Sequence, residues 1–230
     1  RNLNDTIHAK TLVNLGLAYE RIDTKKSRKY FKSSLELHEG GLNGLWVNTA
    51  YVRLAGVYVS IGDRDSALYF FDKSKSYLEK YPNNKGLSAY LTGWGIFNNN
   101  FGNYAEALIA YEKNDELGEA VLGKENMAGN YLNMSNVYAR LNQASKREES
   151  TFKALVIFEE LNNEMGLSFC YNSLGNIFYE QKDYTKAEQY YRKSLNIRIK
   201  RNDKRGMATT YNNLANIAMD TDRFKEALEL

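Results

Sequence analysis

The sequence predicts an all-α fold in which six antiparallel helix pairs, the last one truncated, stack into a right-handed solenoid. Three observations lead to this prediction. A pattern of apolar and small residues returns about every forty residues along the whole chain. Within each copy, the pattern follows the spacing i, i+3, i+4, i+7 that defines one face of a helix. The chain also has one proline in 230 residues, which permits long uninterrupted helices.

The first helix of each copy has a small residue between larger apolar ones. In one well-defined copy the face consists of Tyr171, Leu174, Gly175 and Phe178. The corresponding small residues are Gly16, Ala55, Gly95, Ser135, Gly175 and Ala215, at successive spacings of 39, 40, 40, 40 and 40 residues. Six copies at nearly constant spacing indicate a repeat array rather than a chance pattern.

Residues that favour a helix start precede each of these faces. They are Asn4, Asn43, Asn83, Gly123, Asn163 and Asp203. Asparagine and aspartate side chains accept a hydrogen bond from a free backbone N–H of the first turn, and glycine relaxes the backbone there. We therefore expect the first helices to begin near these positions.

A turn and a second helix follow in each copy. The turn sequences IGDRD, FGNYA and QKDYT offer Asp63, Asn103 and Asp183 as caps for the second helix. These helices carry a small residue four positions before an aromatic one, in the pairs Ser27 and Phe31, Ala67 and Phe71, Ala107 and Tyr111, and Ala187 and Tyr191. A lone helix pair cannot bury its apolar face, so neighbouring pairs must stack.

We expect one array over residues 1–230. Its repeats are predicted at approximately 4–42, 43–82, 83–122, 123–162, 163–202 and 203–230, and the last one breaks off inside its second helix. Because the chain opens at Arg1 and stops at KEALEL, we interpret it as an excised fragment. Its compartment therefore stays open between cytoplasm and periplasm.

The spacing of a leucine, a small residue and an aromatic, followed by an alanine and an aromatic, resembles the tetratricopeptide repeat. The best matches are LGNIFYEQKDYTKAEQYYRKSL at 174–195 and LAGVYVSIGDRDSALYFFDKS at 54–74. The common repeat has about 34 residues, and the longer form seen here resembles the arrays of kinesin light chain and of bacterial peptide-pheromone receptors. Arg147 and Asn114 depart from the pattern, because each stands where a second helix should have a small residue.

Composition argues against several functional classes. The net charge is +3 with both signs interspersed, whereas a nucleic-acid surface needs clustered Lys and Arg. Mean hydropathy is −0.58, and no apolar run approaches the roughly 18 residues that cross a bilayer. A single cysteine, Cys170, is too few for an internal disulfide or a cysteine-based metal cluster. His8 and His38 have no nucleophile beside them in the pattern, so we expect no catalytic residue, metal or cofactor site.

Asparagines recur on the first helices although asparagine is a poor helix former. With Tyr171 at 0° on a helical wheel, the apolar face falls within about 60°, whereas Asn172 and Asn176 lie near 100° and 140°. In tetratricopeptide arrays this face lines the concave inner groove, so the resemblance assigns these amides to a binding surface. The candidate partner-binding residues are Asn136, Asn172, Asn176, Asn212, Asn216 and Tyr179.

Two interpretations of these asparagines stay open. An amide offers both a donor and an acceptor, so it can pair with the backbone of a bound peptide whatever that peptide's side chains are. Alternatively, the amides bridge neighbouring repeats and fix the angle between them without any ligand.

We therefore expect a non-catalytic module that binds a protein or an extended peptide in its groove. The resemblance implies the sensory or regulatory region of a larger bacterial signal-transduction protein, such as a histidine kinase, a cyclase or a DNA-binding regulator. A receptor that encloses a short signalling peptide and a rigid assembly scaffold are the alternatives. End-to-end self-association is also expected, because truncation of the last unit removes cover from Leu214, Ala218 and Phe224.

Overall fold

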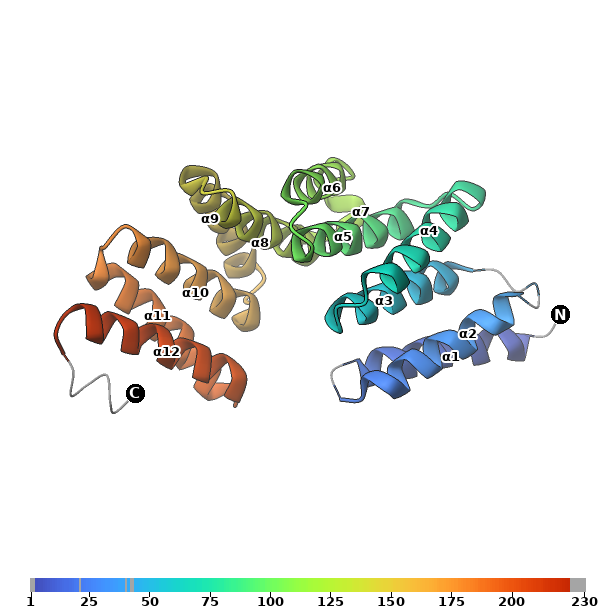
Figure 1. The fold of residues 1–230 in the computed structure, drawn as a ribbon, viewed down its shortest axis with the longest axis horizontal. Coiled ribbons are helices and arrows are strands. Elements are labelled where there is room, and N and C mark those ends of the chain that lie inside the picture. The colour runs from blue at the N-terminus through green and yellow to red at the C-terminus, as the bar shows by residue number, and fades with distance from the viewer. Residues whose placement is uncertain (1–2, 21, 40, 42–43, 224–230) are drawn as a thin grey trace. The chain divides into compact units, whose positions relative to one another are not determined.

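The computed structural model describes residues 3–20, 22–39, 41 and 44–223 (Figure 1). Every regular element among these residues is an α-helix, as predicted. The chain divides into two compact units, residues 1–122 (unit 1) and 123–230 (unit 2). Each unit is a stack of antiparallel helix pairs, so the fold is an all-α helical-repeat solenoid.

Unit 1 contains three helix pairs and one short extra helix. The pairs are α1 (Leu3–Tyr19) with α2 (Thr24–Glu39), α3 (Leu45–Ser60) with α4 (Arg64–Lys80), and α5 (Asn84–Asn100) with α6 (Tyr104–Glu116), followed by α7 (Glu119–Leu122). Within the unit, α2 and α5 both contact α3, which connects the three pairs.

Unit 2 repeats the arrangement with greater regularity. Its helices are α8 (Lys124–Arg140), α9 (Ala144–Glu160), α10 (Glu164–Glu180), α11 (Tyr184–Lys200) and α12 (Lys204–Asp220). The first helices of the pairs, α8, α10 and α12, each begin forty residues after the previous one. Contacts join α8 to α10 and α10 to α12, so the first helices line one continuous face of the unit.

Three of the predicted caps on first helices are confirmed. The side chains of Asn83, Asn163 and Asp203 accept hydrogen bonds from backbone N–H groups three residues later, at 2.6, 2.9 and 3.0 Å. Gly123 also occupies a cap position, with a φ of 74° that favours glycine. Helix α1 begins at Leu3, near Asn4 as expected, but Asn4 lies inside the helix rather than at a cap position. Asn43 lies outside the described residues.

The caps of the second helices are confirmed in two of three cases. Asp63 and Asp183 accept from the backbone N–H groups of Ser66 and Lys186. Asn103 stands at the cap position of α6 but its side chain makes no such bond, and its amide nitrogen donates to the side chain of Asn98.

Gly95 and Gly175 of the first helices lie where the two helices of a pair approach closely. A Cβ added at Gly175 would lie inside van der Waals contact of the Tyr191 ring, and one at Gly95 would meet Tyr111 in the same way. Both rings are buried. A glycine at each position therefore makes room for an aromatic ring of the partner helix.

The third pair differs from the regular pattern that the sequence predicted. Helix α6 ends after 13 residues, and the four-residue helix α7 follows it. Gly118 and Gly123 flank α7, and both have a φ of 74°, in the left-handed region that glycine adopts without strain. These two glycines explain the early stop and the extra helix, which the forty-residue period alone did not predict.

Hydrogen bonds accommodate both departures from the repeat pattern. The buried Arg147 donates to the carboxylate of Glu180 on α10, and the buried Asn114 donates to the hydroxyl of Thr92 at 3.0 Å. Leu214 and Ala218 are 3% and 0% exposed, so the expected loss of cover at these two residues is wrong. Phe224 lies outside the described residues.

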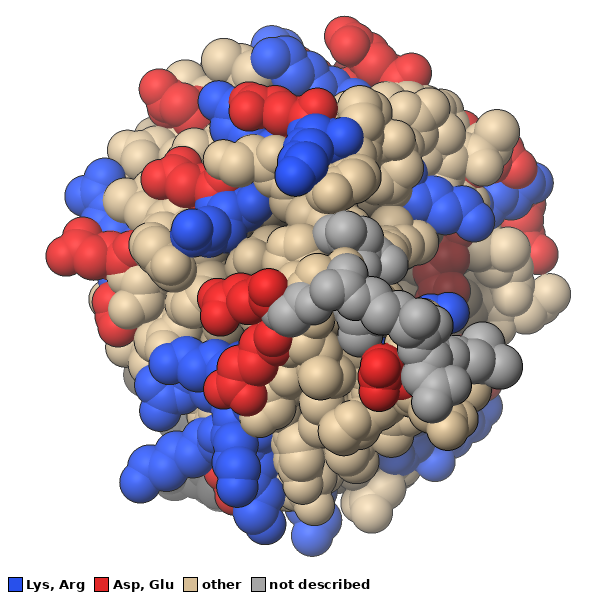
Figure 2. Space-filling view, turned by 90° about the vertical axis from the view of Figure 1, so that its right-hand side faces the viewer, with Lys and Arg blue, Asp and Glu red and all other residues tan. Residues whose placement is uncertain are grey.

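In the view of Figure 2, acidic and basic side chains are interspersed over most of the described surface, and several basic ones gather at the lower left. No described helix combines the length and the apolar character that a membrane span requires.

Candidate functional site

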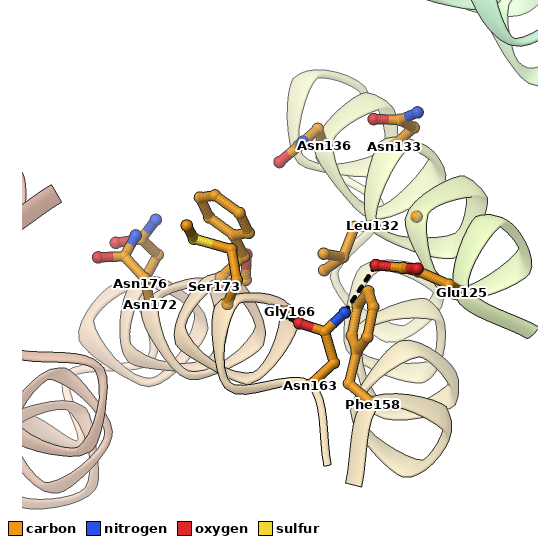
Figure 3. Close-up of a pocket in the computed structure, with 13 residues that line it drawn as sticks. Glu125, Leu132, Asn133, Asn136, Phe158, Asn163, Gly166, Asn172, Ser173 and Asn176 are labelled. Atoms are coloured by element: carbon orange, nitrogen blue, oxygen red, sulfur yellow. Dashed lines mark hydrogen bonds between the residues drawn. The ribbon is translucent and has the colours of Figure 1, made fainter. Parts of the chain in front are cut away.

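A cavity of about 530 Å³ lies between α8 and α10 in unit 2 (Figure 3). Its lining residues come from α8, from α10 with the cap before it, and from Phe158 of α9. They are Glu125, Gly129, Leu132, Asn133, Asn136, Phe158, Asn163, Met165, Gly166, Phe169, Asn172, Ser173 and Asn176. Three of the six candidate residues, Asn136, Asn172 and Asn176, are therefore brought together at one cavity.

The cavity also has an apolar part that the asparagine pattern did not indicate. It is formed by Leu132, Phe158, Met165 and Phe169. Phe169 is 47% exposed, an unusual position for a large aromatic side chain. On the helical wheel used above, Phe169 falls at about 160°, close to Asn176, so the wheel contained a signal for this residue.

One end of the cavity is fixed by an asparagine with two functions. The Asn163 oxygen accepts from the Gly166 N–H at 2.9 Å, which caps α10. The Asn163 nitrogen donates to Glu125 Oε1 at 2.7 Å, which joins α10 to α8 (Figure 3). This bond holds the two cavity walls together at the helix starts.

The oxygen atoms of Asn172 and Asn176 are engaged by neighbouring side chains. Asn213 on α12 donates to both of them, at 3.3 and 3.4 Å. The hydroxyl of the buried Tyr191 donates to Asn176 at 2.7 Å. Figure 3 shows the nitrogen atoms of both amides on the side toward α8. The neighbouring groups therefore fix the amides so that their N–H donors face the cavity.

The other three asparagines are less constrained. Asn136, Asn212 and Asn216 are exposed, and none of them forms a side-chain hydrogen bond with another described residue. Asn136 lines the cavity, whereas Asn212 and Asn216 lie on α12 and do not. Of the five candidate asparagines, three therefore line the cavity, and Asn212 and Asn216 do not.

Tyr179 connects two repeats. Its hydroxyl donates to Asp220 Oδ2 on α12 at 2.6 Å. That hydrogen bond, with smaller contributions from burial and the Asp220 charge, raises the pKa of Tyr179 to about 12. The phenol is therefore neutral at physiological pH, and it is occupied by the bond between α10 and α12.

Cys170, the single cysteine of the chain, does not line this cavity. Cys170 is buried, and this burial raises the pKa of its thiol to about 12, which keeps it protonated. No cluster of His, Cys, Asp and Glu among the described residues could hold a metal ion. What the cavity offers is amide donors and acceptors beside apolar side chains, a combination suited to holding a ligand by shape and hydrogen bonds.

Models of the tetratricopeptide repeat match residues 168–198 and 207–230, both within unit 2. Tetratricopeptide repeats are typically non-catalytic modules for protein interaction. No curated protein matches the chain.

Solved structures of repeat proteins share the fold. A Signal Transduction ATPase with Numerous Domains (STAND) protein from Pyrococcus horikoshii, with a tetratricopeptide repeat sensor, gives a TM-score of 0.81 at 17% identity, over 96% of this chain and 34% of that one. A Rap protein complexed with Competence and Sporulation Factor gives a TM-score of 0.68 at 15% identity, over 95% of this chain and 65% of that one. PilF of Pseudomonas aeruginosa gives 0.62 at 18% identity, over 97% of both chains. This chain therefore spans about a third of the STAND protein.

Proposed function

Because the chain belongs to the tetratricopeptide repeat family, we propose that it is a protein-binding module that holds an extended peptide in the cavity between α8 and α10. The observation that carries this proposal is the arrangement of Asn172 and Asn176. Their oxygens accept hydrogen bonds from neighbouring side chains, and their N–H donors face the cavity. Side chains that are already fixed lose little conformational entropy when a ligand binds.

Asn136 supplies the complementary side of the site. No described residue holds its amide, so the amide can rotate to offer either its oxygen or its nitrogen to a peptide backbone. An extended peptide presents N–H and C=O groups in alternation, which matches fixed donors on α10 and an adaptable amide on α8. Each such hydrogen bond contributes about 0.5–1.5 kcal/mol net.

The apolar side chains that line the cavity favour an apolar side chain in the ligand. Side chains of an extended chain alternate between two faces, so every second residue of the peptide would face Leu132 and Phe169. Glu125 is the one charged residue among the described lining residues, and it already accepts a hydrogen bond from Asn163. The preferred ligand is thus an extended segment with an uncharged, apolar anchor residue.

At the level of the whole protein, this array is the sensory or regulatory region of a larger signal-transduction protein. The similarity to a STAND protein whose tetratricopeptide repeats form a sensor supports that role. A receptor that encloses a short signalling peptide is the second candidate, favoured by the similarity to a Rap protein in complex with Competence and Sporulation Factor. Enclosure would change the small-angle scattering of the full chain on binding, whereas a peptide lying on one face would leave it unchanged.

A cavity-filling variant tests the proposed site. Peptides would be selected from a displayed random library against the full chain and then titrated by fluorescence anisotropy. Nothing lies within 4 Å of a Cβ built on Gly129, so Gly129→Leu should fold normally and occupy the cavity. We expect it to weaken binding at least tenfold, since it takes the space of the anchor residue. Asn196→Ala, at an exposed position of α11, is the control and should bind normally.

Two alanine variants separate a role in peptide binding from a role in stabilising the stack of repeats. Asn136→Ala should weaken binding by about two- to tenfold, the equivalent of one hydrogen bond, with an unchanged melting temperature. Asn176→Ala should weaken binding and also lower the melting temperature, because it removes the acceptor of the buried Tyr191 hydroxyl. Normal binding by both Gly129→Leu and Asn136→Ala would show that the partner binds elsewhere.

A further inference from the structure

Unit 1 has a second candidate surface at the end of α4. Two cavities of about 870 and 370 Å³ share Tyr77, Lys80 and Tyr81, so they form one continuous surface. The larger cavity continues over the start of α5 to α7, and the smaller one continues to the end of α2. We call this continuous lining the lysine–tyrosine surface.

The described lining of this surface is basic. It includes Lys73, Lys80 and Lys85 and contains no aspartate or glutamate. None of the three lysines forms an ion pair with a described residue, although eight ion pairs occur elsewhere among those residues. The Lys80 ammonium lies 5.4 Å from the centre of the Tyr81 ring. Three positive charges are therefore gathered without a carboxylate partner.

The aromatic part of the surface is fixed by hydrogen bonds and ring contacts. The Tyr77 hydroxyl donates to the Gly44 carbonyl oxygen at 2.9 Å and accepts from the Gly44 N–H at 3.1 Å. These bonds join the end of α4 to the start of α3. The rings of Tyr81 and His38 pack against Tyr77 at centroid distances of 4.9 and 5.5 Å. The surface is thus preformed rather than assembled by a ligand.

We propose that the lysine–tyrosine surface binds an acidic segment of a partner protein. Lys73 and Lys80 are seven residues apart on α4, a separation of about 10 Å along the helix axis. Carboxylates on one face of an extended chain are two or four residues apart, about 7 or 13 Å, and the long lysine side chains can span the difference from 10 Å. Lys85, at the start of α5, extends the charge beyond the end of α4. The charge spacing therefore matches an extended segment with several acidic residues better than a single small anion.

Apolar positions next to the lysines fit the same kind of partner. Leu45 is 50% exposed and lines the larger cavity together with Val121 of α7. A segment that combined carboxylates with an apolar residue would bury these two side chains while it paired with the lysines. Glu39 lies near the other end, where burial and then the charge of Glu39 raise the pKa of Tyr51. The acidic residues of the partner would therefore lie over the three lysines and away from Glu39.

Titration of the full chain with a fluorescein-labelled peptide of eight glutamates tests this proposal. The variant Lys73→Gln/Lys80→Gln/Lys85→Gln should weaken binding about tenfold at low salt, because three exposed charge contacts are lost. The matched control changes the exposed residues Lys29, Lys32 and Lys113 to glutamine, which removes the same net charge outside both cavities. The control should change binding less than twofold.

Further titrations separate binding at the lysine–tyrosine surface from binding in unit 2 and from general attraction of anions. Gly129→Leu should leave oligoglutamate binding unchanged, because its cavity lies in unit 2. A peptide of eight glutamines should not bind, and an oligothymidine of eight nucleotides should bind more weakly than oligoglutamate. Three results would each overturn the proposal. They are an equal loss of oligoglutamate affinity in the two triple variants, normal oligoglutamate binding by Lys73→Gln/Lys80→Gln/Lys85→Gln, and tighter binding of the oligothymidine than of oligoglutamate. Circular dichroism checks that both triple variants fold.

Discussion

Two junctions between neighbouring repeats of unit 2 are built from equivalent positions forty residues apart. The upstream junction joins α8 to α10, and the downstream junction joins α10 to α12. The upstream junction contains the cavity of about 530 Å³. At the downstream junction, hydrogen bonds from Asn213 to Asn172 and Asn176 cross directly from one first helix to the next.

Two substitutions between the repeats account for this difference. The position of Asn213 in the downstream junction is occupied by Ser173 in the upstream one, and the position of Asn172 by Leu132. Serine is shorter than asparagine, and leucine cannot accept a hydrogen bond. Without this bridge, the face between α8 and α10 stays open, and Leu132 contributes to its apolar lining.

A third substitution changes the base of the junction. Phe158 lies under the upstream cavity, and Arg198 occupies the equivalent position downstream. Arg198 is 4% exposed and donates to the Gly206 carbonyl at 2.6 Å and to the Thr210 hydroxyl at 2.7 Å. The same framework therefore supports an apolar cavity or a polar brace, depending on a few side chains. The hydrogen bonds from Asn213 fit the bracing interpretation at the downstream junction, and peptide binding at the upstream junction stays a prediction.

The largest difference between the junctions should appear when a methyl group is added at their equivalent glycines. A Cβ at Gly166 would overlap the buried Phe158 ring, whereas one at Gly206 would meet the flexible side chains of Asp203 and Arg198. We expect Gly166→Ala to lower the free energy of unfolding by about 1–3 kcal/mol. Gly206→Ala should cost less, about 0.5–2 kcal/mol, because the Asp203 side chain can move aside at the expense of its cap bond to the Gly206 N–H. Urea denaturation measures both values, and equal costs would show that the two junctions do not differ in rigidity.

The repeated architecture could be predicted from the sequence because its causes are local and periodic. Gly95 and Gly175 stand where an aromatic ring needs space, and Asn163 and Asp203 cap helices within three residues of their own position. Each signal therefore recurs at the forty-residue period. Helix α7 departs from the forty-residue pattern. The positive φ values of its flanking glycines, Gly118 and Gly123, explain this departure, and they are known only from the structure.

The candidate site was predictable only in part. The helical wheel placed Asn136, Asn172 and Asn176 on one face, and all three line the cavity. It could not separate them from Asn212 and Asn216, because a wheel describes one helix and the difference arises between helices. The role of Asn213 was also missed, since its partners lie 41 and 37 residues away in the chain. Such cross-repeat contacts depend on the stacking, which the sequence pattern does not specify.

A smaller effect should come from the bond between Tyr179 and Asp220 at the downstream junction. Tyr179→Phe removes the donor, and because this bond is exposed we expect a loss of at most about 1 kcal/mol in the free energy of unfolding. The effect should depend on pH. The pKa of Tyr179 is raised in the folded chain, to about 12, so its contribution is fully present below pH 10. It is lost as the pH rises from 10 towards 12, because the unfolded chain ionises first.

Urea denaturation of wild type and Tyr179→Phe at several pH values measures this contribution as a difference. The difference should be constant from pH 7 to 9 and should shrink above pH 10. Peptide binding at the upstream cavity should be the same in both proteins, since Tyr179 does not line it. A constant difference up to pH 11 would show that the fold does not raise the pKa of Tyr179. Weaker peptide binding by Tyr179→Phe would show that the two junctions are not independent.

The smallest change is expected for Arg198→Met, which replaces the polar base of the downstream junction by an apolar one. Methionine keeps much of the packing of the arginine stem and removes a charge that is costly to bury. Burial lowers the pKa of Arg198, and its Nε has no hydrogen-bond partner among the described residues, so the present site solvates the charge incompletely. Its two acceptors do not become isolated, because the Thr210 hydroxyl still donates to the Gly206 carbonyl at 3.0 Å. We therefore expect a change within about 1 kcal/mol, neutral or stabilising, in the free energy of unfolding measured by urea denaturation.

Arg198→Ala is the control, and it should destabilise the chain by leaving a void. A loss of several kcal/mol in Arg198→Met would show that the guanidinium hydrogen bonds are essential and that the downstream junction cannot adopt the apolar base of the upstream one.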